Sequence, residues 1–224
     1  FLESLASFLQ SNYQLSSNNT FITGFSNGGE ISYSLAFDGS NVFKAFAPVA
    51  GTVFPNGTIN NLFNPNIPAP MFVTHGYNDN TSFYDGDLFD QFWGPYLSVD
   101  TLVNFWINSN SLNNVIIDTF PDLNNDGNIT ISKKHFSSLT NNEVWLYSHN
   151  NGHNWGDSDI VIEQEIWDFF SLYINNSTQV IELNENRNLI SIYNLLGQEH
   201  LNSKNTFLFY QYDNGEVEKK IIID

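Results

Sequence analysis

Short β-rich segments alternate with amphipathic helical segments along most of this chain, and this alternation is the strongest constraint on its fold. The β-rich runs cover residues 20–25, 42–49, 70–75, 115–118, 129–133 and 144–147. The helical runs cover residues 2–9, 30–37, 98–107 and 160–173. In the clearest of them, Ile162, Ile166 and Phe169 share one face. Strands that are repeatedly separated by helices favour an α/β fold with a largely parallel sheet.

The pattern changes after Asn175. Three short alternating runs follow without an intervening helix, at residues 189–193, 207–212 and 217–223. Turn sequences separate them, Leu196-Gly197 and Asn214-Gly215. We therefore expect two domains: an α/β domain over residues 1–175 and a small all-β module over residues 176–224.

The charge balance excludes two classes of partner. Of 224 residues, 7 are Lys or Arg and 24 are Asp or Glu, which gives a formal net charge of −17. A surface that binds nucleic acid and a surface that docks on anionic lipid both need clustered basic residues, so neither partner is expected. With 41% hydrophobic and 16% aromatic residues, the chain can still bury a substantial core.

Other features of the sequence limit its chemistry and its location. The chain has no Cys, which excludes disulfides, thiolate metal ligands and a cysteine nucleophile. No apolar run approaches the ~20 residues that span a bilayer, so no membrane-spanning segment is expected. The sequence starts at Phe1, inside a helical run and without a Met or a basic leader. We expect that a leader has been removed or that the sequence starts partway into a longer protein.

One glycine-rich segment carries the strongest chemical signal. The segment 24–29, Gly-Phe-Ser-Asn-Gly-Gly, matches G-x-S-x-G, follows a predicted strand and opens a predicted helix. In this context the pattern indicates a nucleophile elbow, a strained turn from which Ser26 projects above the sheet. Asn27 would offer its backbone N–H, at the helix N-terminus, to a developing oxyanion. The alternative is a glycine-rich turn with an incidental serine.

A serine nucleophile needs a general base and a carboxylate that orients the base. In an α/β-hydrolase these follow the serine in the order acid, then histidine, each on a loop after a strand. Asp79 ends the segment His-Gly-Tyr-Asn-Asp (75–79), which follows the predicted strand 70–75, and is the candidate acid. The alternative is a solvated turn residue in a loop that also contains Asp85, Asp87 and Asp90.

His153 is the candidate base. It lies in the segment Asn-Gly-His-Asn-Trp-Gly (151–156), which follows the predicted strand 144–147, and the neighbouring glycines leave it room to move. The alternative is an ordinary loop histidine. Trp155, two residues further on, is a candidate substrate-binding side chain. The other histidines are weaker candidates for the base: His75, His135, His149 and His200.

The segment 122–129, Asp-Leu-Asn-Asn-Asp-Gly-Asn-Ile, matches the first eight positions of an EF-hand-type calcium loop. The twelfth position should hold a bidentate Glu, but it holds Lys133, which removes two ligand oxygens and adds a positive charge. No helix is predicted on either side. We interpret the segment as a polar hairpin turn between strands, and we predict no metal site and no cofactor.

In combination and in order, these motifs resemble the polyhydroxybutyrate depolymerase and feruloyl esterase-like branch of the α/β-hydrolases. The resemblance spans residues 1 to about 174 and rests on segments 24–29 (GFSNGG), 46–51 (FAPVAG), 75–79 (HGYND) with Tyr84 and Gly86, 144–147 (VWLY) and 152–155 (GHNW). It implies Ser26, Asp79 and His153 as a catalytic triad and an ester as the substrate. Gly156 stands where the family often has proline, which concerns only the rigidity of this loop.

The same resemblance implies that part of the domain is missing. Such domains have several strands before the elbow, and the loop after an early strand donates the second oxyanion N–H. We expect this chain to lack those strands and that donor. We also expect an unpaired apolar strand edge at residues 20–25, and therefore poor folding and little turnover.

Residues 189–224 are similar to a C-terminal sorting domain of the type IX secretion system of Bacteroidetes. The similarity rests on segments 190–198 (ISIYNLLGQ), 209–210 (FY), 213–215 (DNG) and 219–222 (KKII). It implies export across the outer membrane and contact with the secretion machinery. The alternative is a generic β appendage, for instance a carbohydrate-binding module.

These features predict a secreted serine carboxylic-ester hydrolase that is extracellular or at the cell surface. Its expected substrates are polymer-linked or short-chain esters of hydroxyalkanoate, feruloyl or acetyl type. Two alternatives stay open. One is a serine peptidase of the same fold, and the other is a non-catalytic surface-binding protein that kept the fold and lost the site.

Overall fold

The computed structural model describes residues 1–55, 68–175, 188–194, 197–199 and 207–221. The chain divides into two compact units, Phe1–Asn175 and Asn176–Asp224, and each has its own β-sheet.

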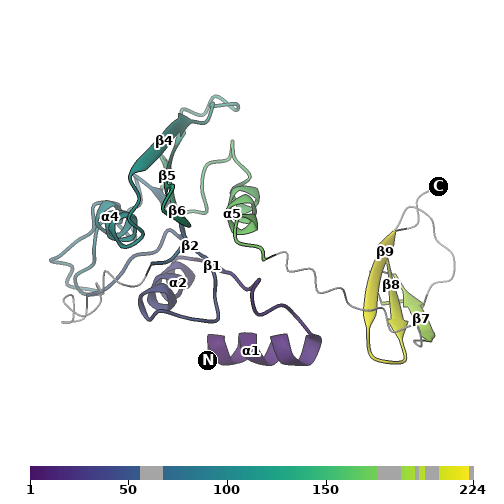
Figure 1. The fold of residues 1–224 in the computed structure, drawn as a ribbon. Helices are drawn as coiled ribbons and strands as arrows, with labels where there is room; N and C mark the ends of the chain where they lie inside the picture. The colour runs from purple at the N-terminus through teal and green to yellow at the C-terminus, as the bar shows by residue number, and fades with distance from the viewer. Residues whose placement is uncertain (56–67, 176–187, 195–196, 200–206, 222–224) are drawn as a thin grey trace. The chain divides into compact units, whose positions relative to one another are not determined.

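The larger unit is built on a six-stranded mixed sheet with the strand order β1-β2-β3-β6-β5-β4; Figure 1 labels its strands other than β3. The strands are β1 (Ile22–Phe25), β2 (Phe46–Val49), β3 (Met71–Gly76), β4 (Asn114–Thr119), β5 (Thr130–Ser137) and β6 (Thr140–His149). Neighbours among β1, β2, β3 and β6 are parallel, and β5 and β4 extend the sheet in antiparallel fashion. The structure confirms the predicted α/β class with a mostly parallel sheet flanked by helices.

Helices pack on both faces of this sheet. The helices of this unit are α1 (Leu2–Tyr13), α2 (Asn27–Phe37), α4 (Val99–Ser109) and α5 (Ile162–Ser171). Side chains of β3 alternate between the faces: Met71 and Val73 share a core with α2 and α4, whereas Phe72 shares a core with α5. This alternation follows from the pleat of the strand. None of the helices in the described parts of the chain is both long enough and apolar enough to cross a membrane.

The central strands are buried throughout. Every residue of β2 and β3 is buried, as expected for parallel strands that are covered on both faces. The strand β4, at the opposite edge of the sheet from β1, is exposed along its whole length. The core is therefore concentrated around the parallel strands, which are also the strands that carry the candidate site.

The hairpin of β5 and β6 is longer than the sequence predicts. The runs 129–133 and 144–147 contain most of its apolar residues, but the strands continue through polar residues as far as the pair Ser137 and Thr140. These additional residues pair with each other, so that cross-strand hydrogen bonds rather than burial determine where the hairpin ends.

The smaller unit contains a three-stranded antiparallel sheet with the order β7-β8-β9. Its strands are β7 (Leu189–Tyr193), β8 (Phe207–Tyr212) and β9 (Val217–Ile221). Leu208 and Tyr212 of the central strand are buried. The described residues of this unit have the all-β character that the sequence predicts.

Replacing Phe169 by Ala should lower the free energy of unfolding by about 3–5 kcal/mol, because the truncation leaves a cavity in the core. Phe169 has no exposed surface, and its ring lies 5.8 Å from that of Phe72 and 5.3 Å from that of Trp145 between centroids. Urea denaturation measures the change. Trp167→Ala, on the same helix, is the control, since Trp167 is 53% exposed and its loss should cost about 1 kcal/mol or less. Equal losses would contradict the assignment of Phe169 to the core.

Candidate active site

Ser26 lies in a sharp turn between β1 and α2. Its backbone has φ 55° and ψ −117°, a positive φ that residues other than glycine rarely adopt. The Ser26 N–H donates a hydrogen bond to the carbonyl oxygen of Val49 in β2, at 2.8 Å. The strand ends at Phe25 and the helix begins at Asn27, which is the strand–turn–helix geometry that the sequence predicts.

Two glycines let α2 approach the sheet closely at this turn, Gly24 where β1 meets the helix and Gly29 where the helix meets β2. A Cβ atom on Gly24 would lie 2.5 Å from the carbonyl carbon of Gly28. A Cβ atom on Gly29 would lie 2.8 Å from the carbonyl oxygen of Val49. Both neighbours are backbone atoms of regular elements and cannot swing aside, so that only glycine fits at either position.

Asp79 lies in the loop after β3, and its side chain is completely buried. One carboxylate oxygen, Oδ1, accepts hydrogen bonds from the backbone N–H groups of Thr81 and Ser82, both at 2.8 Å. The other oxygen, Oδ2, lies 2.7 Å from Nδ1 of His153. The loop therefore fixes one side of the carboxylate and leaves the other side for the imidazole.

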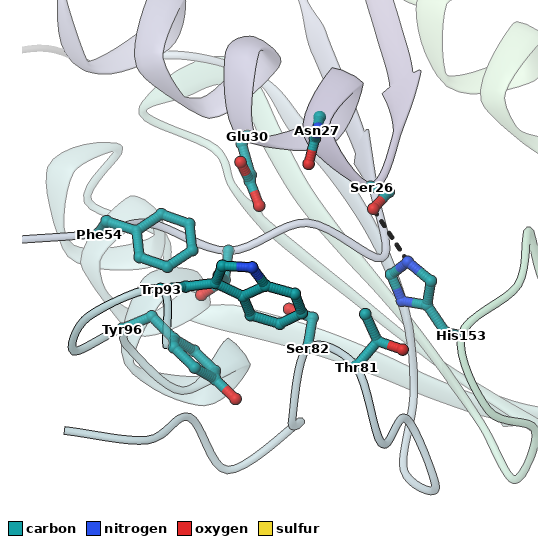
Figure 2. Close-up of a pocket in the computed structure, with 10 residues that line it drawn as sticks. Ser26, Asn27, Glu30, Phe54, Thr81, Ser82, Trp93, Tyr96 and His153 are labelled. Carbon is teal, nitrogen blue, oxygen red and sulfur yellow. Dashed lines mark hydrogen bonds between the residues drawn. The ribbon is translucent and has the colours of Figure 1, made fainter. Parts of the chain in front are cut away.

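His153 lies in the loop after β6 and connects Asp79 to Ser26. Its Nε2 lies 2.9 Å from the Ser26 hydroxyl oxygen, a contact marked in Figure 2. When Nδ1–H donates to the carboxylate, Nε2 is left to accept the hydroxyl proton. The carboxyl ends of the parallel strands β1, β3 and β6 meet at one edge of the sheet. The structure therefore brings together the three side chains that the sequence singles out.

His75, in β3, supports the carboxylate from inside the sheet. Its ring is buried, and Nε2 donates to the Ser82 carbonyl oxygen at 2.7 Å and lies 3.3 Å from Oδ2 of Asp79. Burial by itself would raise the pKa of the Asp79 carboxyl, but hydrogen bonds from His75, the Ser82 N–H and His153 lower it to about 2. Asp79 is therefore ionised at neutral pH. The sequence makes His75 a weaker candidate for the base than His153, and the geometry places it where it can position the carboxylate of Asp79.

The loops that carry the acid and the base touch at Gly76. A Cβ atom on Gly76 would overlap the carbonyl oxygen of Asn151 and would lie 2.5 Å from that of Gly152. The absence of a side chain at this one position allows the two loops to come close enough for the hydrogen bond between Asp79 and His153.

Ser26 and His153 open onto a cavity of about 480 Å³ (Figure 2). Its other lining residues are Asn27, Glu30, Thr52, Phe54, Thr81, Ser82, Trp93 and Tyr96. Sequence reasoning identified Asn27 but missed Glu30 and the aromatic residues. A signal existed for Glu30, because it follows Ser26 by four residues at the start of a predicted helix, where such residues share a face. The aromatic residues lie in loops, whose conformations no periodic pattern reveals.

Trp155, the sequence candidate for substrate binding, lies beside the triad. Its ring stacks on Phe25 with the centroids 5.8 Å apart, and Phe25 contacts the imidazole of His153 at 4.9 Å. Trp155 is not among the described residues that line the cavity. The structure places it as a support for the histidine ring, and a contact with substrate stays a prediction.

The segment 122–129 connects β4 and β5, which pair as an antiparallel hairpin, as the sequence predicts. Asp122 accepts hydrogen bonds from the backbone N–H groups of Asp126 and Gly127, which shape the turn. Asp159, from the loop before α5, joins this group, and ligand oxygens of the three carboxylates lie within 4.8 Å of one another. The spacing of residues in the segment could not reveal this third carboxylate.

The sheet is mostly parallel, and Ser26, Asp79 and His153 follow three of its strands in this order. This is the arrangement of the α/β-hydrolase fold. No family model matches the chain, and no curated protein matches it in sequence. Among solved structures, an acetyl xylan esterase from Aspergillus awamori is similar, with a TM-score of 0.47 and 12% identity. The match covers 76% of this chain and 66% of that one. This chain thus spans just under two thirds of the length of that structure.

Gly76→Ala should lower the free energy of unfolding by about 1–3 kcal/mol, because the new methyl group must push the two loops apart. Chemical denaturation measures the effect. Gly28→Ala is the matched control, since a Cβ atom there meets no other atom within 4 Å and Ala is the better helix former. Gly28→Ala should leave stability unchanged or slightly higher. Equal stability of the two variants would show that the loops do not pack as described.

Proposed function

We propose that this protein is a serine carboxylic-ester hydrolase. The observation that carries the proposal is the hydrogen-bonded series Ser26–His153–Asp79, in which the serine occupies a strained turn and faces a cavity. A buried ionised acid, a histidine whose Nε2 faces the hydroxyl, and open space beside that hydroxyl are the parts that acyl transfer requires.

In the first half of the reaction, the Ser26 hydroxyl oxygen attacks the ester carbonyl carbon while Nε2 of His153 takes the hydroxyl proton. Collapse of the tetrahedral intermediate breaks the bond to the alcohol, and His153 gives the proton to the departing oxygen. In the second half, water loses a proton to His153 and attacks the acyl-serine. Ser26 leaves and takes this proton back, and the acid is released. Asp79 stays ionised and stabilises the imidazolium that forms twice.

The intermediate carries a negative oxygen that needs hydrogen-bond donors. The N–H of Ser26 is already used by the carbonyl of Val49 and is not a donor for this purpose. Asn27 is the first residue of α2, and its N–H has no acceptor within the helix. We therefore assign the Asn27 N–H as one donor of the oxyanion hole.

The resemblance of the motifs also supports a proposal for substrate and location. We propose polymer-linked or short-chain esters of hydroxyalkanoate, feruloyl or acetyl type as substrates of a catalytic domain over residues 1–175. We propose residues 176–224 as the address for type IX secretion, and the protein as extracellular or bound to the cell surface. The support for both is the sequence resemblance described above.

In a form of the protein that includes the strands expected before Phe1, Ser26→Ala, His153→Ala and Asp79→Asn should each lower kcat/KM for p-nitrophenyl acetate by about 10⁴-fold. Because the members of a triad act as a unit, the double variant Ser26→Ala/His153→Ala should be little worse than either single variant. Initial rates of ester hydrolysis measure this. Labelling by a fluorophosphonate, followed by peptide mapping, should place the adduct on Ser26.

Each alternative has its own outcome in this experiment. A wild-type protein that shows neither an adduct on Ser26 nor hydrolysis would be a binding protein. Turnover of a peptide amide as well as of the matched ester would indicate a peptidase, because an esterase cleaves the ester alone. Normal turnover by Asp79→Asn would refute the assigned acid and direct attention to Asp85 or Asp87.

Deleting residues 179–224 from a form that includes the strands expected before Phe1 should leave ester hydrolysis by the purified protein unchanged and should abolish export from a host with type IX secretion. The reason is that the described triad and cavity lie within Phe1–Asn175. Activity in purified protein and in culture supernatant measures the two effects. Weaker binding to a polymeric substrate with unchanged export would instead identify a binding module.

A further inference from the structure

Glu30 brings a carboxylate into the cavity beside Ser26. It lies in the first turn of α2, and its side chain points into the cavity that Trp93 also lines (Figure 2). It is also close enough to His153 for the charges to interact. Neither the elbow geometry nor the triad requires an acid at this position.

Among the described residues, no Lys or Arg pairs with this carboxylate. No described Lys or Arg lines the cavity, and none of the described residues forms a salt bridge with Glu30. Burial raises the pKa of Glu30, and the charge interaction with His153 offsets this only in part. A half-buried carboxylate without a partner is unfavourable, so that a positive group from outside the protein would complete the site.

Three aromatic rings line the same cavity. The rings of Phe54 and Tyr96 meet edge to face with their centroids 5.7 Å apart. Trp93 lies in a turn that Asp90 stabilises: its Oδ1 accepts hydrogen bonds from the backbone N–H groups of residues 92, 93 and 94. The indole is therefore held by its backbone while half of its surface is exposed. Aromatic faces attract ammonium groups.

The charge of Glu30 also bears on the reaction itself. The tetrahedral intermediate places a negative charge beside Ser26, and a carboxylate in the same cavity repels it. A positive charge on the substrate would offset this repulsion.

We propose that Glu30, with the rings of Phe54, Trp93 and Tyr96, forms a subsite for an ammonium group of the substrate. The preferred ester then carries a positive charge, as an ester of an amino alcohol or of a quaternary ammonium alcohol does. The inference rests on the proposed function, because it assigns the substrate class of that same site. It is compatible with the acetyl esters of that proposal, and it specifies that the alcohol part of the ester is positively charged.

Acetylcholine and 3,3-dimethylbutyl acetate test this, because they have nearly the same shape and differ in charge at one atom. We expect kcat/KM of the wild type to favour the cationic ester about tenfold, and Glu30→Gln to remove this preference. The ratio of the two esters cancels any general loss of activity. Glu163→Gln makes the same charge change on the exposed face of α5, outside the cavity lining, and should keep the wild-type ratio.

Tetramethylammonium chloride tests the subsite without turnover. Its addition should shift the indole N–H resonance of Trp93 in the NMR spectrum, and this resonance is identified by its absence in Trp93→Phe. Sodium chloride at the same concentration should give no shift. In Glu30→Gln the response should need about tenfold more tetramethylammonium.

The outcomes separate this inference from the proposed function. Equal turnover of both esters and no response of Trp93 would overturn the subsite and leave the hydrolase intact. A preference for the cation that persists in Glu30→Gln would also overturn it. A response of Trp93 that depends on Glu30, in a protein that hydrolyses neither ester, would support the subsite and overturn the proposed function.

Discussion

The close approach of α2 to β1 and β2 around Ser26 is the constraint on which the site depends. Gly24 lets the backbones of β1 and α2 touch, and Gly29 lets the backbones of α2 and β2 touch, where any side chain would overlap the neighbouring backbone. These contacts hold Ser26 at a positive φ and commit its N–H to Val49. Two consequences follow together: the hydroxyl projects toward the imidazole, and the next N–H along the chain, that of Asn27, is the first one available to a substrate oxygen.

The two carboxylates of the site have opposite surroundings. Asp79 receives hydrogen bonds from its own loop and from two imidazoles, and the pKa of this carboxyl falls to about 2. His149, at the end of β6, lies close enough to His75 for their charges to interact. Burial and His75 lower the pKa of His149 to about 4, so that its imidazole is neutral at neutral pH. Glu30, in contrast, receives no such support, and burial raises its pKa. The fold thus gives Asp79 several hydrogen-bond donors, whereas the Glu30 carboxylate faces the cavity without such donors among the described residues.

Two kinds of feature could be predicted from the sequence: local turns, and the shared edge at which parallel strands end. The elbow at Ser26 follows from glycines within a few residues, and the positions of Asp79 and His153 follow from the parallel order of the strands. The cavity wall at Trp93 could not be predicted, because an irregular loop places it. The approach of Asp159 to Asp122 joins residues far apart in sequence. No periodic pattern records a contact of this kind.

The sheet supports Ser26, Asp79 and His153, the three residues of the proposed triad, unequally. Among the described strands, β1 lies at the edge and pairs with β2 alone, whereas β3 and β6 are central and pair with each other along six residue positions. Asp79 and His153 therefore follow two strands that pair directly, whereas Ser26 is held by the pairing of β1 with β2 and by the packing of α2 on β2. We expect heating to separate Ser26 from His153 before it separates His153 from Asp79, because the loops that carry the latter two residues pack against each other at Gly76.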